Sequence, residues 1–367
     1  MNGQNLNRLL NNFTVNNVQL RKHRKTEALN YWQPIVHAVI DSVKRRDRRF
    51  ASSHIFHTGS YYDGSKVGEP DEFDMMLVMD NLALGDDEPY EEDDGMIDPP
   101  IGFTRVMIDR GEEMLWQQDN CVNARGMLNA QQLKAVFVRL VRDSIRTLGQ
   151  QYSRCIEVKT HGPAVTLEIT NRNNRRKYSI DVVLAIKDKH WPDDAEEWKD
   201  SVRRGWPNRR LIQEICQDGC YLVAKQPKGG RIPDQEKHFL WLYSFAAAEK
   251  KLLREGSHGE ASSCRKLVFR ILKALKEELN WQPLKSFHLK MMLFYECEEN
   301  PLQWSSEHIS HRFIGLLNRL ENCLRHSNCP HYFIRNFNLF EFFPRQRCAE
   351  LADSVQRVRD NPQNYLE

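Results

Sequence analysis

The stretch HTGSYYDGSKVGEPDEFDMMLVMD, residues 57–80, joins a turn of small residues to a strand that begins with acids. The turn is TGS at 58–60, and the strand starts as EFD at 72–74 before it becomes apolar. Side chains alternate between the faces of a strand, so Glu72 and Asp74 lie on the same face. Unpaired carboxylates are costly to bury, and divalent cations commonly hold such pairs. An edge strand whose acids are simply solvated is the alternative.

Two further features favour a nucleotide site over solvated acids. Gly59 and Ser60 precede a short helix and offer free backbone N–H groups and a hydroxyl, which suit the phosphates of a nucleotide. Far downstream, the β-rich run KYSIDVVLAI at 177–186 contains one acid, Asp181. An acid in an apolar strand needs a partner or a cation. If the two strands are neighbours, three carboxylates could hold two Mg²⁺ ions for nucleotidyl transfer.

Seven segments along nearly the whole chain follow the order of a known family. They are TGSYY (58–62), PDEFD (70–74), GPAVTL (162–167), Ile180-Asp181, HWP (190–192), YLVAK (221–225) and FIRNFNLF (333–340). With these segments the chain resembles the nucleotidyltransferase superfamily, and more closely its Mab-21 branch. That branch includes cyclic GMP-AMP synthase (cGAS) and the animal cGAS-like receptors.

The resemblance implies an α+β, bilobal nucleotidyltransferase fold. Residues 1–210 would form the core lobe, with a long N-terminal spine helix at about 17–50 and a mixed twisted sheet that carries the acids. Residues 211–367 would form the helical C-terminal Mab-21 lobe, with the active site in the cleft between the lobes. The length agrees, because 367 residues exceed the usual size of a single core.

The resemblance also assigns roles to individual residues. Glu72, Asp74 and Asp181 would be the catalytic residues and the ligands of Mg²⁺ or Mn²⁺. Residues that would contact the nucleotides are Thr58, Gly59, Ser60, Lys225, Ser244, Lys273, Ser286 and Phe287. Taken alone, each lysine could equally be a surface lysine. Phe287 could stack on a base or be an ordinary core residue, since it lies at helical spacing.

Two positions depart from cGAS where that enzyme selects its bases. Leu242 replaces an arginine, and Val183 replaces a polar residue two positions after the third acid. Because both positions differ, the identity of the bases to be joined is open.

A third departure concerns zinc. The DNA-sensing vertebrate enzyme has a His-Cys-Cys-Cys zinc thumb in the interval that corresponds to residues 255–264. Here that interval offers only His258 and Cys264, whereas a structural zinc needs four ligands. We expect no structural zinc. The missing thumb favours double-stranded RNA over DNA as the activating nucleic acid, because RNA duplexes are recognised by shape and phosphates.

Positive charge is concentrated at the N-terminal end of the chain. Residues 1–50 contain ten Lys or Arg against three Asp or Glu, whereas residues 80–98 contain nine acids and no base. The first region is a candidate polyanion face and the second a solvated loop. The candidate nucleic-acid contacts are Arg21, Lys22, Arg24, Lys25, Lys44, Arg45, Arg46, Arg203, Arg204, Arg209 and Arg210. The alternative is that these residues are simply solvated.

Periodicity predicts most of the elements. Apolar residues at helical spacing indicate a long helix over 18–50, with a bend near Pro34, after a weakly ordered start at 1–16. Strands are expected at 102–108, 155–160, 164–170 and 178–186, with a helix at 131–149. Beyond residue 192 the pattern predicts almost entirely helix, at 239–254, 262–279, 286–299, 307–325 and 345–359.

Composition indicates an intracellular, cytoplasmic protein. No apolar run reaches the roughly 20 residues that a membrane span needs, and the polar N-terminus MNGQNLNRLLNN has no signal-peptide pattern. Nine scattered cysteines fit reduced thiols better than a disulfide framework.

Three functional hypotheses follow. The favoured one is a nucleic-acid-activated enzyme of innate immune signalling that joins two NTPs into a cyclic dinucleotide. A catalytically silent Mab-21 protein with a binding or developmental role is the second, and a linear oligonucleotide synthetase is the third. The bases, the 2′–5′ or 3′–5′ linkage, the activating ligand and the oligomeric state are open; a dimer on nucleic acid is one option.

Overall fold

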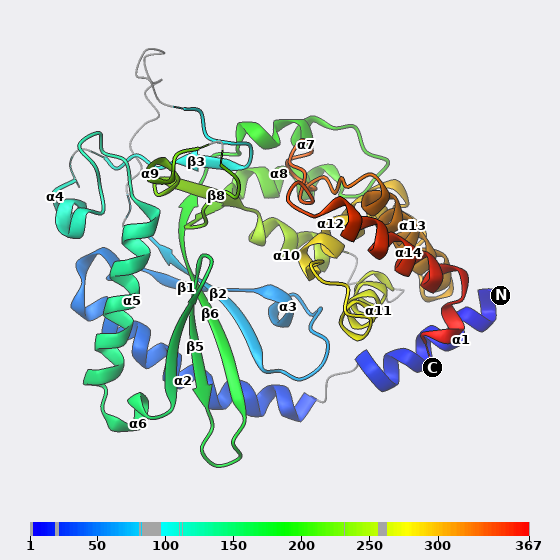
Figure 1. The fold of residues 1–367 in the computed structure, drawn as a ribbon, viewed down its shortest axis with the longest axis horizontal. Coiled ribbons are helices and arrows are strands. Elements are labelled where there is room, and N and C mark those ends of the chain that lie inside the picture. Colours follow the sequence, from blue (N-terminus) through cyan, green and yellow to red (C-terminus); the bar gives the residue numbers. More distant parts are fainter. Residues whose placement is uncertain are drawn as a thin grey trace.

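The computed structural model describes residues 3–18, 22–80, 82, 97–109, 111, 113–230, 232–255 and 263–366. Figure 1 shows a central sheet with a layer of helices behind it and a helical region at one end. The strands are β1 (His54–Thr58), β2 (Glu72–Met79), β3 (Phe103–Arg105), β4 (Ile156–His161), β5 (Ala164–Thr170), β6 (Lys177–Asp188), β7 (Cys220–Val223) and β8 (Leu240–Ser244).

The sheet is mixed and follows the order β1-β2-β6-β7-β8-β3. Its strand pairs are antiparallel except β2 with β6, which is parallel. One edge of β6 pairs with β2, while its other edge is shared: residues 177–183 pair with β5, and residues 185–188 pair with β7. The sheet therefore forks at β6, the strand that carries Asp181.

Helices cover the sheet and build the second region. They are α1 (Gly3–Phe13), α2 (Lys22–Arg46), α3 (Gly59–Tyr62), α4 (Glu113–Gln117), α5 (Ala130–Thr147), α6 (Gln150–Ser153), α7 (Glu196–Asp200), α8 (Arg209–Asp218), α9 (Asp234–Lys237), α10 (Ala246–Arg254), α11 (Arg265–Glu278), α12 (Ser286–Glu299), α13 (Ile309–Arg325) and α14 (Arg345–Asp360). In Figure 1, α2 runs behind the strands and α10 to α14 gather beside the sheet.

One face of the sheet forms the main core with α2 and α5. The apolar residues of β2 that alternate with its acids, Phe73 and Met75, are buried there. The Trp32 ring of α2 lies 4.8 Å from the Phe73 ring. Burial of this face forces the even-numbered residues of β2 onto the opposite face, as the alternation predicts.

The long N-terminal helix is confirmed, although it is shorter than expected. It spans Lys22–Arg46 with Pro34 inside, and Trp32, Val36 and Val39 on its buried side are fully covered. Asp47 ends it by accepting a hydrogen bond from the Arg49 N–H, and a short 3₁₀ turn follows. The predicted helix at 131–149 and the strands from 155 to 188 are also confirmed.

The prediction of a weakly ordered start was wrong. Residues 3–13 form α1, whose Leu6, Leu10 and Phe13 are buried. Asn7 holds α1 to the start of α13 and to the 3₁₀ turn before it. The Asn7 amide donates to the Glu307 carbonyl at 3.1 Å, and its side-chain oxygen accepts from the Ser310 N–H at 3.1 Å. Apolar residues at i, i+4 and i+7 form one helix face, which the surrounding asparagines obscure.

The prediction of almost pure helix beyond residue 192 was also wrong. β7 and β8 extend the sheet, so the expected helix at 239–254 is a strand followed by α10. Sheet pairing with β7 and β3 decides the state of WLYS, a short apolar run that periodicity cannot assign. The four later helices are confirmed. The strand expected at 102–108 is shorter, at Phe103–Arg105. The division of the chain at residue 210 stays a prediction.

Candidate active site

One row of residues crosses the sheet at the predicted site. Thr58 of β1 is the register partner of Asp74 of β2, and Asp74 is the partner of Asp181 of β6. On the next strand, Thr166 of β5 is the partner of Asp181. Residues opposite each other on neighbouring strands project from the same face and are about 5 Å apart. The predicted neighbourhood of the two acidic strands is therefore confirmed.

Glu72 lies two residues before Asp74 on the same face, and a lysine partly neutralises it. Its Oε2 is 3.2 Å from the Nζ of Lys66, which also lies 3.2 Å from Oδ1 of Asp71. The Lys66 side chain is largely buried, whereas Glu72 is exposed. Lys66 therefore supplies positive charge beside the acids.

Gly59 brings the turn directly over Asp74. It adopts a φ of +75°, and a Cβ added at Gly59 would fall 1.9 Å from Oδ2 of Asp74. Positive φ and this close approach each disfavour other residues. α3 begins at Gly59, with Thr58 as its N-cap residue. The sequence therefore needs glycine at this position to put the Ser60 segment next to the carboxylate.

Asp74 ionises less readily than an ordinary aspartate, mainly because the protein desolvates its carboxylate. Burial raises the pKa of Asp74 to about 6, and repulsion by Asp181 and Glu72 adds to the effect, while Lys290 and Lys66 oppose it. Asp74 as a whole residue is exposed, so solvent weakens the effect of this local desolvation. Thr166 donates its hydroxyl hydrogen to Oδ1 of Asp181 at 2.6 Å, which fixes the orientation of that carboxylate.

The chemistry of this donor set fits Mg²⁺ or Mn²⁺. Carboxylate oxygens are hard ligands, and three of them on adjacent strands repel one another unless positive charge intervenes. In the part of the chain that the structure describes, however, no three His, Cys, Asp or Glu side chains are gathered closely enough to hold a metal ion. Glu72 instead contacts Lys66 and Asp181 contacts Thr166, so these side chains would have to reorient to hold cations.

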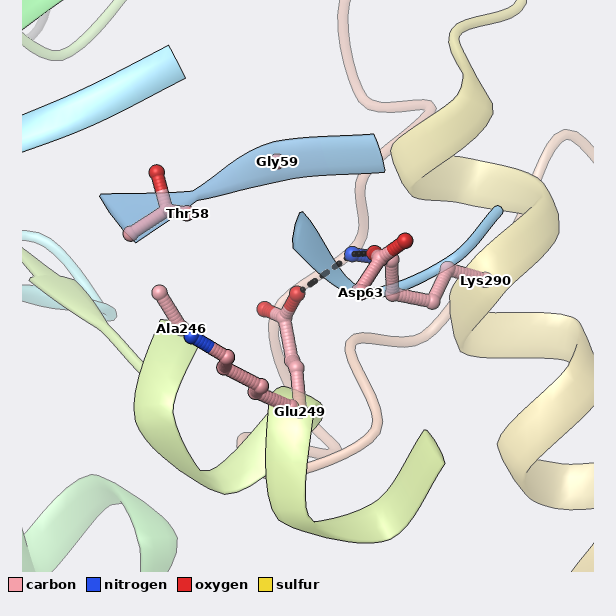
Figure 2. Close-up of a pocket in the computed structure, with 7 residues that line it drawn as sticks. Thr58, Gly59, Asp63, Ala246, Glu249 and Lys290 are labelled. Carbon is pink, nitrogen blue, oxygen red and sulfur yellow. Dashed lines mark hydrogen bonds and ion pairs between the residues drawn. The ribbon is translucent and has the colours of Figure 1, made fainter. Parts of the chain in front are cut away.

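A cavity of about 20 Å³ lies beside the turn, between the sheet and the helical region (Figure 2). This is room for about one water molecule. It is lined by Thr58, Gly59, Asp63, Ala246, Glu249, Lys250 and Lys290. Sequence reasoning missed the last five. The sequence could have pointed to Asp63, because it follows the Gly59-Ser60 turn by a few residues. Nothing in the sequences of α10 and α12 points to Glu249 or Lys290 as neighbours of the turn.

The predicted nucleotide contacts lie in different surroundings. Lys273 is buried in α11 and donates to the Ser65 carbonyl at 2.7 Å. Burial lowers its pKa to about 8. Lys225 follows β7 and is exposed as a whole residue. Neighbouring protein atoms still desolvate its ammonium, and Lys285 and Lys228 repel it, so its pKa is lowered.

Ser244 and Ser286 occupy element ends. Ser244 is the last residue of β8, and its register partner on β7 is Tyr221. The partner of Tyr221 on β6 is Lys187, six residues beyond Asp181. Ser286 opens α12. The next residue, Phe287, is half-buried, and its ring lies 5.7 Å from the His331 ring. The structure therefore groups Thr58, Gly59 and Ser60 with the acids, whereas Ser244 lies further along the sheet.

The two positions that depart from cGAS lie on the acidic face of the sheet. Leu242 and Val183 pack against a small apolar cluster that includes Met76, Ala185 and Val223. This cluster continues the face on which Asp74 and Asp181 lie. Both departures thus add apolar surface to one end of the candidate site.

Many of the predicted nucleic-acid contacts are already engaged with other groups. On α2, Arg24 pairs with Glu69, and Arg46 donates to Thr147. Lys25 lies over the Tyr61 ring. Lys44 and Arg45 end the helix near the surface. Arg21 lies outside the described residues, as does the side chain of Lys22.

The basic residues at 203–210 differ in exposure and in their partners. Arg203 is buried, with its Nε 3.0 Å from Glu298 and its guanidinium over the Trp198 ring. Arg210 pairs with Glu214, whereas Arg204 and Arg209 are exposed. Most of the acidic 80–98 loop and of the interval expected to lack zinc, His258 included, lies outside the described residues.

Two family models match the chain. The Mab-21 protein nucleotidyltransferase domain matches residues 61–255, and the Mab-21 protein HhH/H2TH-like domain matches residues 264–357. The first match contains all three acids, and the second contains most of α11 to α14. Among the described residues, no helix has the length and apolar character needed to cross a membrane.

Proposed function

Because the chain belongs to the Mab-21 family, with its nucleotidyltransferase domain, we propose that it transfers nucleotidyl groups with the help of divalent cations. The observation that carries the proposal is the register of the sheet. Asp74 and Asp181 are opposite each other on parallel strands, Glu72 lies two residues away, and Gly59 brings the Gly59-Ser60 turn against Asp74.

Each protein group has a role in this proposal. Glu72, Asp74 and Asp181 hold Mg²⁺ or Mn²⁺, and the N–H groups and hydroxyl of the Gly59-Ser60 turn bind the triphosphate. When bound, the cations favour deprotonation of the attacking hydroxyl and neutralise the leaving pyrophosphate. Thr166 orients Asp181. Because Asp74 has a raised pKa without cations, cation binding and its ionisation are coupled.

The finer proposal is the synthesis of a cyclic dinucleotide from two NTPs. A ribose hydroxyl of one nucleotide attacks the α-phosphorus of the other, a new P–O bond forms, and the α–β P–O bond breaks to release pyrophosphate with loss of the hydroxyl proton. A second step of the same kind closes the ring. The resemblance to cGAS-like receptors supports this product.

The proposed setting is cytoplasmic innate immune signalling, with a double-stranded nucleic acid as activator. Double-stranded RNA is favoured over DNA because the interval 255–264 has only two candidate zinc ligands. The exposed basic residues at the end of α2, with Arg204 and Arg209, would contact phosphates.

The test is product analysis by mass spectrometry. The protein is incubated with Mg²⁺ or Mn²⁺ and all four NTPs, alone or with long double-stranded RNA or DNA. A cyclic dinucleotide is expected with RNA, and Asp74→Asn and Asp181→Asn should abolish it. Asp353→Asn is the matched control, because this exposed acid lies on α14, outside the row of acids. Product that survives both catalytic substitutions would refute the proposed site.

The alternatives give different results in the same experiment. A linear oligonucleotide synthetase would yield products of several lengths with free ends. A silent Mab-21 binding protein would yield none under any condition, although its acids are intact. The intact set of three acids favours the enzyme, since silent relatives tend to lack the third.

A further inference from the structure

A buried lysine links the turn at Gly59 and Ser60 to the helical region. Lys290 of α12 lies between two carboxylates: its Nζ is 3.1 Å from Oδ2 of Asp63 and 3.0 Å from Oε2 of Glu249. Only 13% of the Lys290 side chain is exposed, with 5% of Asp63 and 10% of Glu249. Figure 2 shows the three side chains meeting beside Thr58 and Gly59. These three residues are called the Lys290 bridge below.

Asp63 also contacts the turn through its second carboxylate oxygen. Its other oxygen, Oδ1, accepts hydrogen bonds from the Ser65 N–H at 2.9 Å and from the Ser65 hydroxyl at 2.5 Å. The Ser65 N–H also donates to the Ser60 carbonyl at 2.9 Å, and the Asp63 N–H donates to the Gly59 carbonyl at 3.1 Å. The backbone from Gly59 to Ser65 is therefore one hydrogen-bonded unit with Asp63 at its centre.

A second lysine from the helical region holds the far end of this unit. Lys273 of α11 donates to the Ser65 carbonyl at 2.7 Å. Lys250 of α10 donates to the carbonyl of His57, just before the turn, at 3.1 Å. In the helical region, α10, α11 and α12 thus each contact the segment 57–65 through a lysine. Lys250 and Lys273 contact backbone carbonyls, whereas Lys290 contacts the Asp63 side chain.

The charge balance of the Lys290 bridge makes Lys290 its critical member. Burial alone would lower the pKa of Lys290, but Glu249 and Asp63 raise it above its ordinary value. Removing the lysine leaves two buried carboxylates without the positive charge that they share, which is much more destabilising than removing a solvated pair. Asp63 would then move toward solvent and take the turn with it.

We infer that Lys290 is a positioning residue that holds the Gly59–Ser65 segment over Asp74 from the helical region, so that the phosphate site is preformed. The effect of Lys290 on nucleotide binding rests on the proposed function. The effect of Lys290 on the position of the segment does not rest on it, and this effect can be measured without a nucleotide.

The first measurement is hydrogen exchange of the peptide that covers residues 58–66. Lys290→Met keeps the length and apolar stem of the side chain but removes its charge. We expect exchange in this peptide to accelerate about tenfold while α5 is unchanged, because the change is a local opening. Lys276→Met is the matched control, since this lysine of α11 is 6% exposed and pairs with Glu277 of the same helix. Exchange as slow as in the wild type would overturn the inference.

The second measurement is the affinity for a non-hydrolysable NTP analogue with Mg²⁺ by calorimetry. Lys290→Met should weaken binding about tenfold, which is about 1.4 kcal/mol, whereas Lys276→Met should not. Lys290→Arg should restore both binding and slow exchange. If the wild type binds no analogue but Lys290→Met still accelerates exchange, the positioning role stands and the proposed function fails. Full analogue binding by a folded Lys290→Met variant would overturn the positioning role.

A further variant distinguishes a loss of positioning from a loss of folding. Asp63→Asn, Glu249→Gln and Lys290→Met together remove every charge of the Lys290 bridge, so no carboxylate is left unpaired. This protein should melt close to the wild type and still exchange faster at residues 58–66, because the ion pairs that hold the segment are gone. Exchange at the wild-type rate would overturn the inference.

Discussion

At the scale of single residues, the site depends on close approaches that few side chains permit. Gly59 lies against Asp74, Thr166 holds Asp181, and Lys66 lies beside Glu72. Each contact fixes either the position or the charge of one acid. The mixture of positive and negative groups keeps three carboxylates on one face of a folded sheet. Substitutions here should therefore alter chemistry more than folding.

Gly59→Ala should impair the site directly. The new methyl group would overlap the Asp74 carboxylate, and the positive φ adds strain, so we expect a loss of about 1–2 kcal/mol in stability and of most activity. Gly162→Ala is the control, because it also has a positive φ but no atom within 4 Å of the added Cβ. Thermal denaturation and product formation measure the two effects. Equal behaviour of the two variants would contradict the role of the close approach.

The raised pKa of Asp74 predicts a pH-dependent stability in the metal-free protein. The folded value of about 6 exceeds the ordinary 3.8, so the folded chain binds this proton more tightly. The corresponding stability is present below pH 3.8 and is lost as the pH rises through 6. Asp74→Asn cannot ionise, so it does not lose this stability as the pH rises. Its melting temperature should exceed that of the wild type by a few degrees at about pH 7 but not at about pH 4.

Added Mg²⁺ provides the check on that prediction. At neutral pH it should raise the melting temperature of the wild type, because the cation binds the ionised acids of the folded state. It should leave Asp74→Asn nearly unchanged. A melting difference that does not vary with pH would contradict the assigned pKa.

At the scale of elements, strand pairing and helix docking bring distant segments to the site. β2 and β6 are about one hundred residues apart in sequence, yet their parallel register sets Asp74 opposite Asp181. α1 connects the N-terminal end of the chain to the helical region, where Asn7 contacts α13. In Figure 1, α1 lies beside the C-terminal end of the chain, far from the sheet.

Leu10→Ala tests the docking of α1. Leu10 is fully buried, so the cavity should cost about 2–4 kcal/mol in the free energy of unfolding. Leu9→Ala on the same helix is the control, because Leu9 is only partly buried and should cost about 1 kcal/mol or less. Urea denaturation measures both. Similar small losses would show that α1 is held weakly.

At the scale of the whole molecule, the site lies where the sheet meets the helical region. The sheet supplies the acids and the turn, while α10, α11 and α12 supply the lysines that hold the turn. Exposed basic residues occur at the end of α2, at Arg204 before α8 and at Arg209, where α8 begins.

Lys44→Ala with Arg45→Ala tests the proposed nucleic-acid face. Loss of two phosphate contacts should weaken binding of double-stranded RNA and reduce the slope of log affinity against log salt by about two. Arg347→Ala on α14 is the control, since this half-buried arginine pairs with Glu350. Binding measured over a range of salt concentrations decides the matter. An unchanged slope would exclude these two residues from the interface.

The sequence by itself determined the local features: the glycine turn, the alternation of Glu72 and Asp74, the acid within the β6 run and the long basic helix. Each follows from periodicity or from residue chemistry within a few positions. Only the tertiary structure decided the register that pairs Asp74 with Asp181, the strands β7 and β8, the docking of α1 and the place of Lys290 between Asp63 and Glu249. These depend on partners far away in the chain, because a short apolar run or a single lysine is compatible with several environments until the packing of the whole molecule selects one.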